Sequence, residues 1–325
     1  MHAIRVHAFG GPETLQLTTC AQPEPGAGEV LIRLHAAGVN PVETYIRAGA
    51  YPVLPSLPWT PGHDGAGEVA GLGAGVTDLS LGDRVYVAGS LTGTYAEACV
   101  SARQTVHRLP ERLGFEQGAG IGVPCTTAWH ALFQRGSARP GETVLIHGAT
   151  GAVGIAAVQM ASAAGMRVLA TGGSESGRQR LLTLGADAVF DHHDPQHLDA
   201  IQAACNGNGV DVILEMLANV NLGDDLSILA HGARVLVIGN RGDVTINPRH
   251  LMQRRASVIG VALAHVTPVE YREAHAAMGA LIRSGLLSPI VADVLPLARA
   301  ADAHVQVMTD GGFGKLVLAT DQPME

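Results

Sequence analysis

Three glycines that follow a short apolar segment offer phosphate-binding chemistry. The chain reads Thr143-Val-Leu-Ile-His147 and continues as Gly148-Ala-Thr-Gly151-Ala-Val-Gly154. In this spacing Gly148 allows a tight turn, Gly151 lets the backbone approach a pyrophosphate, and Gly154 lets a helix pack closely on a strand. The free N–H groups at the start of that helix then face the phosphates. Because such glycines also occur in strand–helix turns that bind nothing, the flanking elements decide their meaning.

The flanking segments complete a strand–helix–strand unit. Val153, Ala157 and Met160 recur at helical spacing after Gly151, and Gly165 stands where a helix end is expected. The segment 167–171 is apolar and β-branched, as a buried parallel strand requires. The pattern therefore predicts a dinucleotide-binding βαβ unit.

The end of the second strand indicates which dinucleotide is bound. Sites that prefer NAD usually carry an Asp or Glu there, and none directly follows Thr171. Ser174 can hydrogen-bond a 2′-phosphate, and Arg178 or Arg180 can neutralise it, so we favour NADPH. Glu175 argues for NADH, unless it only stabilises the first turn of the next helix.

Composition and charge narrow the function classes. A chain of 325 residues exceeds what one core usually supports, so two domains are expected. A formal charge of −8 argues against nucleic acid as a general partner. The four cysteines are far apart without a CxxC pair, which argues against a disulfide framework or a structural zinc site. We find no long apolar run and no signal-peptide core, and so expect a cytoplasmic protein without a membrane partner.

The distribution of short apolar runs separates two kinds of domain. Residues 1–122 alternate such runs with Gly and Pro, which predicts an antiparallel, barrel-like β domain. Over residues 123–263 strand and helix patterns alternate, which predicts a doubly wound parallel sheet, an α/β arrangement of the Rossmann type. Residues 264–325 read as helix, strand, helix and strand, and we assign them to the first domain.

Several sequence blocks outside the glycine loop are more specific than the loop itself. They are Gly38-Val-Asn-Pro-Val-Glu-Thr-Tyr45, Pro61-Gly-His-Asp-Gly-Ala-Gly-Glu-Val69, Gly82-Asp-Arg-Val85 and Glu215-Met-Leu-Ala-Asn219. In this order they resemble the zeta-crystallin-like quinone oxidoreductases, a zinc-free branch of the medium-chain dehydrogenase/reductase superfamily. The likeness runs through nearly the whole chain.

The resemblance implies a GroES-like catalytic domain, split in sequence around a Rossmann domain, with the active site in the cleft. It also implies NADPH chemistry without metal, with Asn40 and Tyr45 beside the nicotinamide. Relatives commonly carry a Lys at the position of Gly177, so its absence shifts the 2′-phosphate contact to Ser174 and nearby arginines. The candidate cofactor contacts, from loop and resemblance together, are Tyr45, Thr126, Gly148, Thr150, Gly151, Ala152, Val153, Gly173, Ser174, Arg178, His192, Asn221, Ile238, Gly239, Asn240, Arg241, Val261, Ala262, Leu263 and Lys315.

Zinc has to be considered because of His63. Zinc-dependent alcohol dehydrogenases of the same superfamily carry three ligands, at positions that resemble Asn40, His63 and Val123 here. Catalytic zinc needs three protein ligands and an open position, and this set supplies one. We therefore expect no metal, and interpret His63 as a hydrogen-bonded residue that contacts the substrate.

The sequence contains no motif for a catalytic metal or a general base, which points to a substrate that accepts reducing equivalents with little activation. A quinone is such an acceptor, because its reduced form is aromatic; orientation and exclusion of water then supply much of the catalysis. We expect hydride or electron transfer from NADPH to a quinone held among Asn40, Tyr45, Tyr51 and His63, with Asn40 or Tyr45 hydrogen-bonding the developing oxyanion. The alternatives are wall packing for the tyrosines and a strand-end cap for Asn40.

Two other functions stay open at this point. Close relatives reduce the activated C=C bond of alkenals and enones, and zeta-crystallin-like proteins also serve in non-catalytic structural or RNA-binding roles. The apolar segment 257–263 is expected at an edge of the sheet and has to be covered. Since sheets in this family commonly join edge to edge, we predict a homodimer, or a homotetramer of paired dimers.

Overall fold

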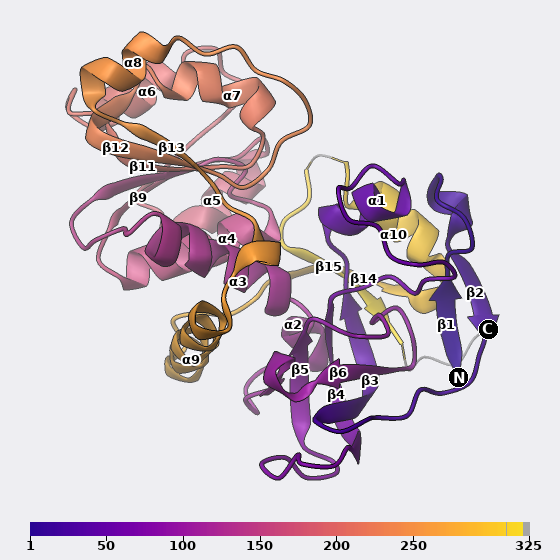
Figure 1. Cartoon of the computed structure of the whole chain (residues 1–325). Helices are drawn as coiled ribbons and strands as arrows, with labels where there is room; N and C mark the ends of the chain where they lie inside the picture. The colour runs from indigo at the N-terminus through magenta and orange to yellow at the C-terminus, as the bar shows by residue number, and fades with distance from the viewer. Residues whose placement is uncertain (310, 321–325) are drawn as a thin grey trace. The chain divides into compact units, whose positions relative to one another are not determined.

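The computed structural model describes residues 1–309 and 311–320, and its chain forms two compact units. The first unit comprises Met1–Val123 and the segment that begins at Ser288, and the second comprises Pro124–Leu287. Figure 1 colours the chain by residue number. Residues 310 and 321–325, part of the first domain in the sequence-based division, lie outside the described residues.

The first unit is built mainly of antiparallel strands. Its strands are β1 (His2–Arg5), β2 (Gln16–Thr19), β3 (Glu29–Gly38), β4 (Asp64–Leu72), β5 (Arg84–Ala88), β6 (Ala98–Ala102), β7 (Val106–Arg108), β14 (Val291–Pro296) and β15 (Lys315–Ala319). Its helices are η1 (Pro12–Thr14), α1 (Pro41–Arg47), η2 (Arg103–Thr105), α2 (Phe115–Gly118), η5 (Leu297–Arg299) and α10 (Ala300–Gln306).

The long strand β3 organises this unit because it pairs with β4, β6 and β15. Its inward side chains, Val30, Ile32 and Leu34, enter an apolar core with residues of β4, β5 and β6. The C-terminal strand β15 runs antiparallel to β3, with Val317 opposite Gly38. The segment after Ser288 therefore completes the sheet that the first third of the chain begins.

The second unit alternates strands and helices. Its strands are β8 (Thr143–Ile146), β9 (Arg167–Thr171), β10 (Ala188–Phe190), β11 (Val210–Glu215), β12 (Leu229–Val237) and β13 (Ser257–Gly260). Its helices are α3 (Gly122–Trp129, across the unit boundary), the π-helix η3 (His130–Arg135), α4 (Ala152–Ala163), α5 (Glu175–Thr183), α6 (His197–Ala204), α7 (Ala218–Asp225), α8 (Pro248–Arg254), η4 (Leu263–His265) and α9 (Pro268–Ser284).

All six strands of the second unit run parallel, in the order β10-β9-β8-β11-β12-β13. In Figure 1 helices α4 and α5 lie on one face of this sheet and α6, α7 and α8 on the other. The order reverses between β8 and β11, which makes the carboxyl ends of these two strands the switch point where nucleotides bind in such sheets. The predicted fold class, a Rossmann-type sheet with a GroES-like antiparallel domain, is confirmed.

Helix α9 lies elsewhere than the sequence suggested. We assigned residues 264–325 to the first domain, whereas the compact units divide at Leu287. The α9 side chain of His275 contacts Thr126 of α3 at 3.3 Å, and Gln134 of η3 donates to the Glu270 carbonyl at 2.7 Å. The buried face of α9 thus packs within the second unit, which amphipathic spacing alone could not show. No helix in the described ranges has the length and apolar character that crossing a membrane requires.

Candidate active site

The glycine loop has the geometry that its sequence predicts. Gly148 has φ +56°, a left-handed conformation suited to glycine. A Cβ on Gly154 would lie 2.5 Å from the Ala149 Cα, so only glycine permits this approach of α4 to the loop. A Cβ on Gly151, the N-cap of α4, would meet only the Gly148 carbonyl, at 3.5 Å. The start of α4 is thus open to an anionic ligand.

Candidate adenosine contacts gather at the end of β9. A Cβ on Gly173 would come within 3.0 Å of both the His192 and His193 rings, so this glycine makes space beside them. Ser174 caps α5, and its Oγ accepts from the Gly177 N–H at 3.2 Å. Its hydroxyl proton remains a possible donor to a phosphate.

Arg178 is held differently from the sequence-based expectation. Its guanidinium donates to Asp191 at 2.8 Å, to Glu175 at 2.6 Å, and to the carbonyls of Gly172 and Gly173. Two carboxylates already balance the charge of Arg178. Its guanidinium therefore stabilises the loop after β9 and is not a free cation for a 2′-phosphate.

Several of the other candidate cofactor contacts lie after β11, β12 and β13. Asn221 donates to the Glu215 carboxylate at 3.1 Å, and the Arg241 N–H donates to the Asn219 side chain at 2.9 Å. A Cβ on Gly239 would lie 2.2 Å from the Met216 carbonyl, which explains the glycine. Thr150, Ala152, Val153, Ile238 and Leu263 are half-buried, His192, Asn240 and Ala262 are exposed, and Thr126 and Val261 are buried.

In the first unit, Asn40 and Glu43 tie the end of β3 to helix α1. Asn40 is the N-cap of α1 and Glu43 is its N3 residue, the spacing of a capping box. The Asn40 N–H donates to Glu43 Oε2 at 2.8 Å. Both residues are buried, with Asn40 only 3% exposed.

The Asn40 amide is fully engaged by buried charges. Its Nδ2 donates to Asp64 at 2.9 Å and to Glu43 at 3.3 Å, while its Oδ1 accepts from the Lys315 ammonium at 2.5 Å. Lys315, 2% exposed, also pairs with Asp64 at 2.9 Å. Asn40 therefore has no remaining N–H for a substrate oxyanion, and its role here is to position its neighbours. Lys315, which we expected among the cofactor contacts, bonds Asn40 and Asp64 in this network.

His63 forms an ion pair with Glu43. Its Nδ1 lies 3.2 Å from Glu43 Oε1, and its side chain is 41% exposed whereas that of Glu43 is inaccessible. Burial by itself would raise the pKa of Glu43, but its bonds to His63 and Asn40 and the charge of Lys315 lower this pKa to about 2. Burial would lower the pKa of His63, and the Glu43 and Asp64 carboxylates outweigh it and raise this pKa. The imidazolium form is thus favoured beside a fixed carboxylate.

Tyr95 and His304 complete the network behind Glu43. The Tyr95 hydroxyl donates to Glu43 Oε2 at 2.8 Å and lies 3.1 Å from His304 Nε2. Burial raises the pKa of Tyr95 well above its usual value and lowers the pKa of His304 to about 4. Both groups therefore stay neutral at physiological pH and serve as hydrogen-bonding supports.

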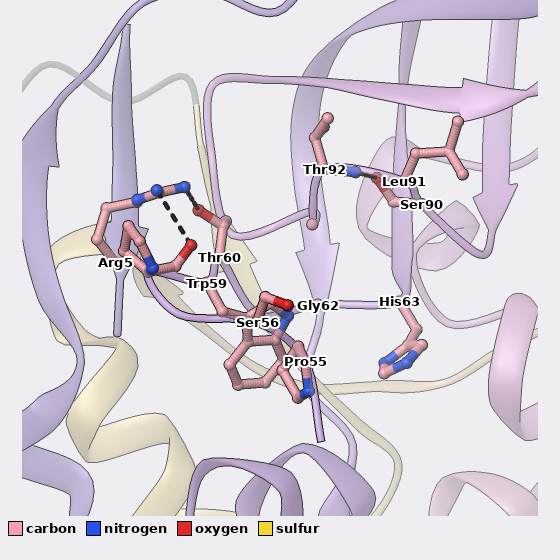
Figure 2. Close-up of a pocket in the computed structure, with 12 residues that line it drawn as sticks. Arg5, Pro55, Ser56, Trp59, Thr60, Gly62, His63, Ser90, Leu91 and Thr92 are labelled. Carbon is pink, nitrogen blue, oxygen red and sulfur yellow. Dashed lines mark hydrogen bonds between the residues drawn. The ribbon is translucent and has the colours of Figure 1, made fainter. Parts of the chain in front are cut away.

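A pocket of about 370 Å³ opens beside His63 within the first unit. Figure 2 shows its lining, which includes Arg5, Trp59, Thr60 and Leu91. The lining combines an aromatic ring, an apolar side chain and cationic groups, which suits a planar acceptor with polar oxygens.

Tyr45 and Tyr51 do not line this pocket. Tyr45 belongs to α1 and Tyr51 follows it, and both are half-buried. Within residues 1–309 and 311–320 neither hydroxyl makes a hydrogen bond. The ligand contacts predicted for the two hydroxyls stay predictions, and the structure does not bring them together with His63 in the pocket.

The residues at the expected zinc position do not fit the metal. Asn40 is bound to the Lys315 ammonium, and Asp64 is shared by Lys315, Asn40 and the Val123 N–H, which donates at 2.7 Å. A buried cation already neutralises the carboxylate here, and Val123 offers no ligand side chain. His63 is the single imidazole of the set.

Sequence reasoning missed Glu43, Asp64, Tyr95 and His304 as members of the site. Glu43 could have been found, because an Asn followed three residues later by Glu has capping-box spacing. Asp64 adjoins His63 in the Gly-His-Asp block. The contribution of Tyr95 and His304 depends on packing between residues 209 positions apart, which one sequence does not reveal.

Comparisons with known proteins agree with the fold of both units. Residues 26–134 match the alcohol dehydrogenase GroES-like domain family, and residues 152–280 match the zinc-binding dehydrogenase family. Human quinone oxidoreductase is 46% identical over 98% of this chain and 97% of its own. The structure of Escherichia coli quinone oxidoreductase complexed with NADPH is 30% identical, with a TM-score of 0.86 over 98% of this chain and all of that one. An NAD-dependent alcohol dehydrogenase reaches a TM-score of 0.92 at 30% identity over 98% of this chain and all of that one. The chain therefore belongs to the quinone oxidoreductase family of the medium-chain dehydrogenase/reductase superfamily.

Proposed function

We propose that this enzyme uses NADPH to reduce small quinones. The observation that carries the proposal is the 46% identity to human quinone oxidoreductase over 98% of the chain. The NADPH complex of the similar Escherichia coli enzyme supports the choice of cofactor. The glycine loop fits a pyrophosphate, since the open start of α4 at Gly151 presents free N–H groups.

The residues of the second unit hold the nucleotide in this proposal. Thr150, Ala152 and Val153 receive the pyrophosphate, and Gly173 with His192 receives the adenosine half. Ser174 donates to the 2′-phosphate, and Asn221 contacts the opposite half. When bound, NADPH supplies a hydride to the acceptor.

His63 supplies the proton that balances the reaction. A quinone that gains a hydride becomes an oxyanion, and one further proton completes the hydroquinone. Glu43 holds His63 by Nδ1, which leaves Nε2 to donate the proton to that oxygen. The half-exposed ring then takes a new proton from water. Tyr45 and Tyr51 lie outside the pocket beside His63, and we keep their hydroxyls as candidate ligand contacts apart from this proton transfer.

Two further proposals rest on the sequence, namely a location in the cytoplasm and association into a homodimer. Strand β13 supports the second, because it is the edge strand of the six-stranded sheet and its Val258 side chain is 37% exposed. An apolar edge strand is normally covered by another chain or element.

The test is NADPH oxidation, followed by absorbance, with a panel of ortho- and para-quinones, enones and aldehydes, and with NADH and a chelator as controls. We expect rapid turnover of quinones with NADPH that the chelator does not change. Turnover of enones alone would move the function to reduction of activated C=C bonds. If no acceptor were reduced, the proposed activity would be refuted.

A further inference from the structure

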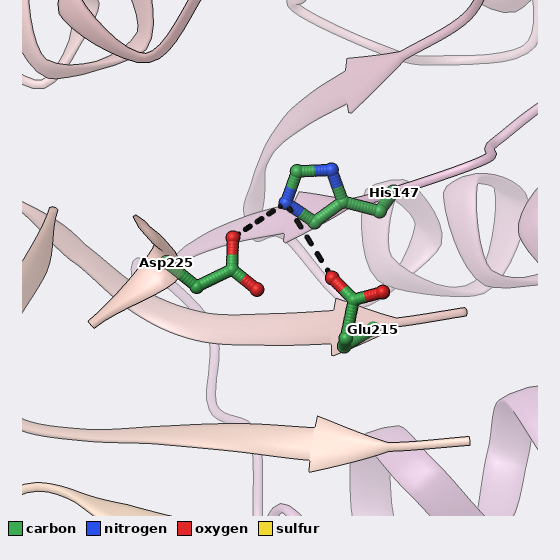
Figure 3. A group of neighbouring side chains, drawn as sticks. All are labelled: His147, Glu215 and Asp225. Carbon is green, nitrogen blue, oxygen red and sulfur yellow. Dashed lines mark hydrogen bonds and ion pairs between the residues drawn. The ribbon is translucent and has the colours of Figure 1, made fainter. Parts of the chain in front are cut away.

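Three buried ionisable residues lie at the switch point of the parallel sheet. His147 follows β8, Glu215 ends β11, and Asp225 is the last residue of α7. All three are buried. His147 Nε2 lies 2.9 Å from Asp225 Oδ1 and 3.9 Å from Glu215 Oε2, as Figure 3 shows. The proposed catalytic steps use none of these groups.

This network connects both sides of the switch point to the nucleotide loop. On one side, the Thr171 hydroxyl at the end of β9 lies 3.4 Å from His147 Nδ1 and accepts from the Gly148 N–H at 3.2 Å. On the other side, Glu215 Oε1 accepts from the Leu217 N–H and from Asn221. The loop glycine and the candidate cofactor contact Asn221 are therefore linked through hydrogen bonds and the His147–Glu215 ion pair.

The charges of the network cannot all be balanced by His147. Glu215 Oε2 and Asp225 Oδ2 are buried, and neither has a hydrogen-bond partner among the described residues. Two ionised carboxylates and one imidazolium would leave a net negative charge away from water, which is costly. A proton on Glu215 removes that charge and provides a donor toward Asp225.

Glu215 changes its protonation state near neutral pH. Burial, reinforced by the Asp225 carboxylate and opposed by His147, raises the pKa of Glu215 to about 7. Burial would lower the pKa of His147, and the Asp225 and Glu215 carboxylates outweigh it and raise this pKa. Burial, the neighbouring His193 and the charge of His147 lower the pKa of His192.

We propose that His147, Asp225 and Glu215 are positioning residues whose shared proton controls the affinity for the nucleotide. Protonated Glu215 holds Asn221 and the glycine loop in the binding geometry. Ionised Glu215 repels Asp225, loosens this arrangement and adds negative charge near the bound phosphates. This inference rests on the proposed use of NADPH.

The sign of the effect follows from the protonation states. Glu215 is neutral below its raised pKa of about 7 and becomes charged as the pH rises through this value. The affinity for NADPH should therefore be highest at mildly acidic pH and fall toward alkaline pH. Coupling between such a proton and a ligand is typically worth about fivefold or more in affinity.

The experiment is a fluorescence titration of the full chain with NADPH, without acceptor, at mildly acidic and at alkaline pH. The wild-type Kd should rise about fivefold more across this range than that of Glu215→Gln, which mimics the protonated carboxyl. The 2′-phosphate of NADPH titrates as well, but equally in both proteins. Glu142→Gln, whose carboxylate pairs with Arg234, is the matched control and should keep the wild-type pH dependence.

Asp225→Asn is the second variant, because it removes the repelling carboxylate and should also flatten the pH dependence. It serves if Glu215→Gln fails to fold, as judged by circular dichroism. The same pH dependence in wild type and either folded variant would overturn the positioning proposal while leaving the use of NADPH intact. Absence of NADPH binding at every pH would overturn both.

Discussion

Glu43 joins the parts of the candidate site in the first unit. Its carboxylate accepts from the Asn40 N–H, the Tyr95 hydroxyl and the His63 N–H groups. These bonds hold His63 in one orientation and favour its charged form. The chemistry assigned to His63 therefore depends on a residue whose own side chain is inaccessible.

The first prediction concerns the stability that Glu43 provides. Glu43→Gln should lower the free energy of unfolding at neutral pH by about 3 to 5 kcal/mol, because a buried, paired charge loses its partner. Folding lowers the pKa of Glu43 from 4.5 to about 2. The ionised carboxylate therefore contributes its full stabilisation above about pH 4.5, and this stabilisation is lost as the pH falls toward 2. Urea denaturation at several pH values measures it. The exposed Glu175→Gln serves as control and should change stability little; an equal loss in both would contradict the assignment.

The second prediction concerns His63 as the proton donor. His63→Gln should reduce kcat for quinones by about 100-fold or more, with little change in the KM for NADPH, because only the proton transfer is lost. Wild-type kcat should also fall as the pH rises through the raised pKa of His63, since the imidazolium is the active form. Steady-state kinetics across pH tests both. His2→Gln, which alters a surface pair with Glu97, should leave kcat unchanged. A wild-type kcat in His63→Gln would exclude His63 from the reaction.

At the scale of elements, the approach of α4 to its loop requires the third glycine. Gly154→Ala would place its Cβ 2.5 Å from the Ala149 Cα, and backbone has to move to relieve this overlap. We expect a loss of about 1 to 3 kcal/mol in stability and weaker NADPH binding. Thermal unfolding and fluorescence titration measure the two effects. Gly312→Ala is the matched control, because nothing lies within 4 Å of its added Cβ. If Gly154→Ala bound NADPH and unfolded like wild type, the packing argument would be wrong.

Sequence patterns predicted strands and helices well where the buried apolar residues recur at regular spacing along the chain. Strand β9 has the predicted bounds, 167–171, and the second unit alternates strands and helices as predicted. The short strands β2 and β7 have no long apolar run, so apolar patterning does not predict them. The placement of α9 depends on contacts with α3 and η3 that hydrophobic periodicity does not encode.

The candidate site was predictable to the extent that local geometry defines it. Gly148 and Gly154 have local backbone roles, and the structure agrees with both. Arg178 was assigned to the cofactor as a cation near the expected 2′-phosphate, and Lys315 was included among the candidate contacts, yet both pair with carboxylates of their own unit. Which carboxylate a cation meets is a tertiary property, and a single sequence leaves it open.

For the whole molecule, the edge strand β13 bears on the assembly. Val258→Lys places a charge on this edge and should convert a dimer to a monomer, because burying an unpaired ammonium in an interface is costly. Light scattering at micromolar concentration measures the mass, and circular dichroism verifies the fold. A monomeric wild type, or a variant of unchanged mass, would contradict association through β13.

The central claim, hydride transfer from NADPH to a quinone with proton transfer by the protein, is tested most directly by the stoichiometry of an anaerobic reaction. The measurement compares NADPH consumed with hydroquinone formed, using NADPH deuterated at the transferred position. We predict one hydroquinone per NADPH and a slower reaction with the deuterated cofactor. Failure to consume NADPH, or semiquinone as the released product, would contradict the account.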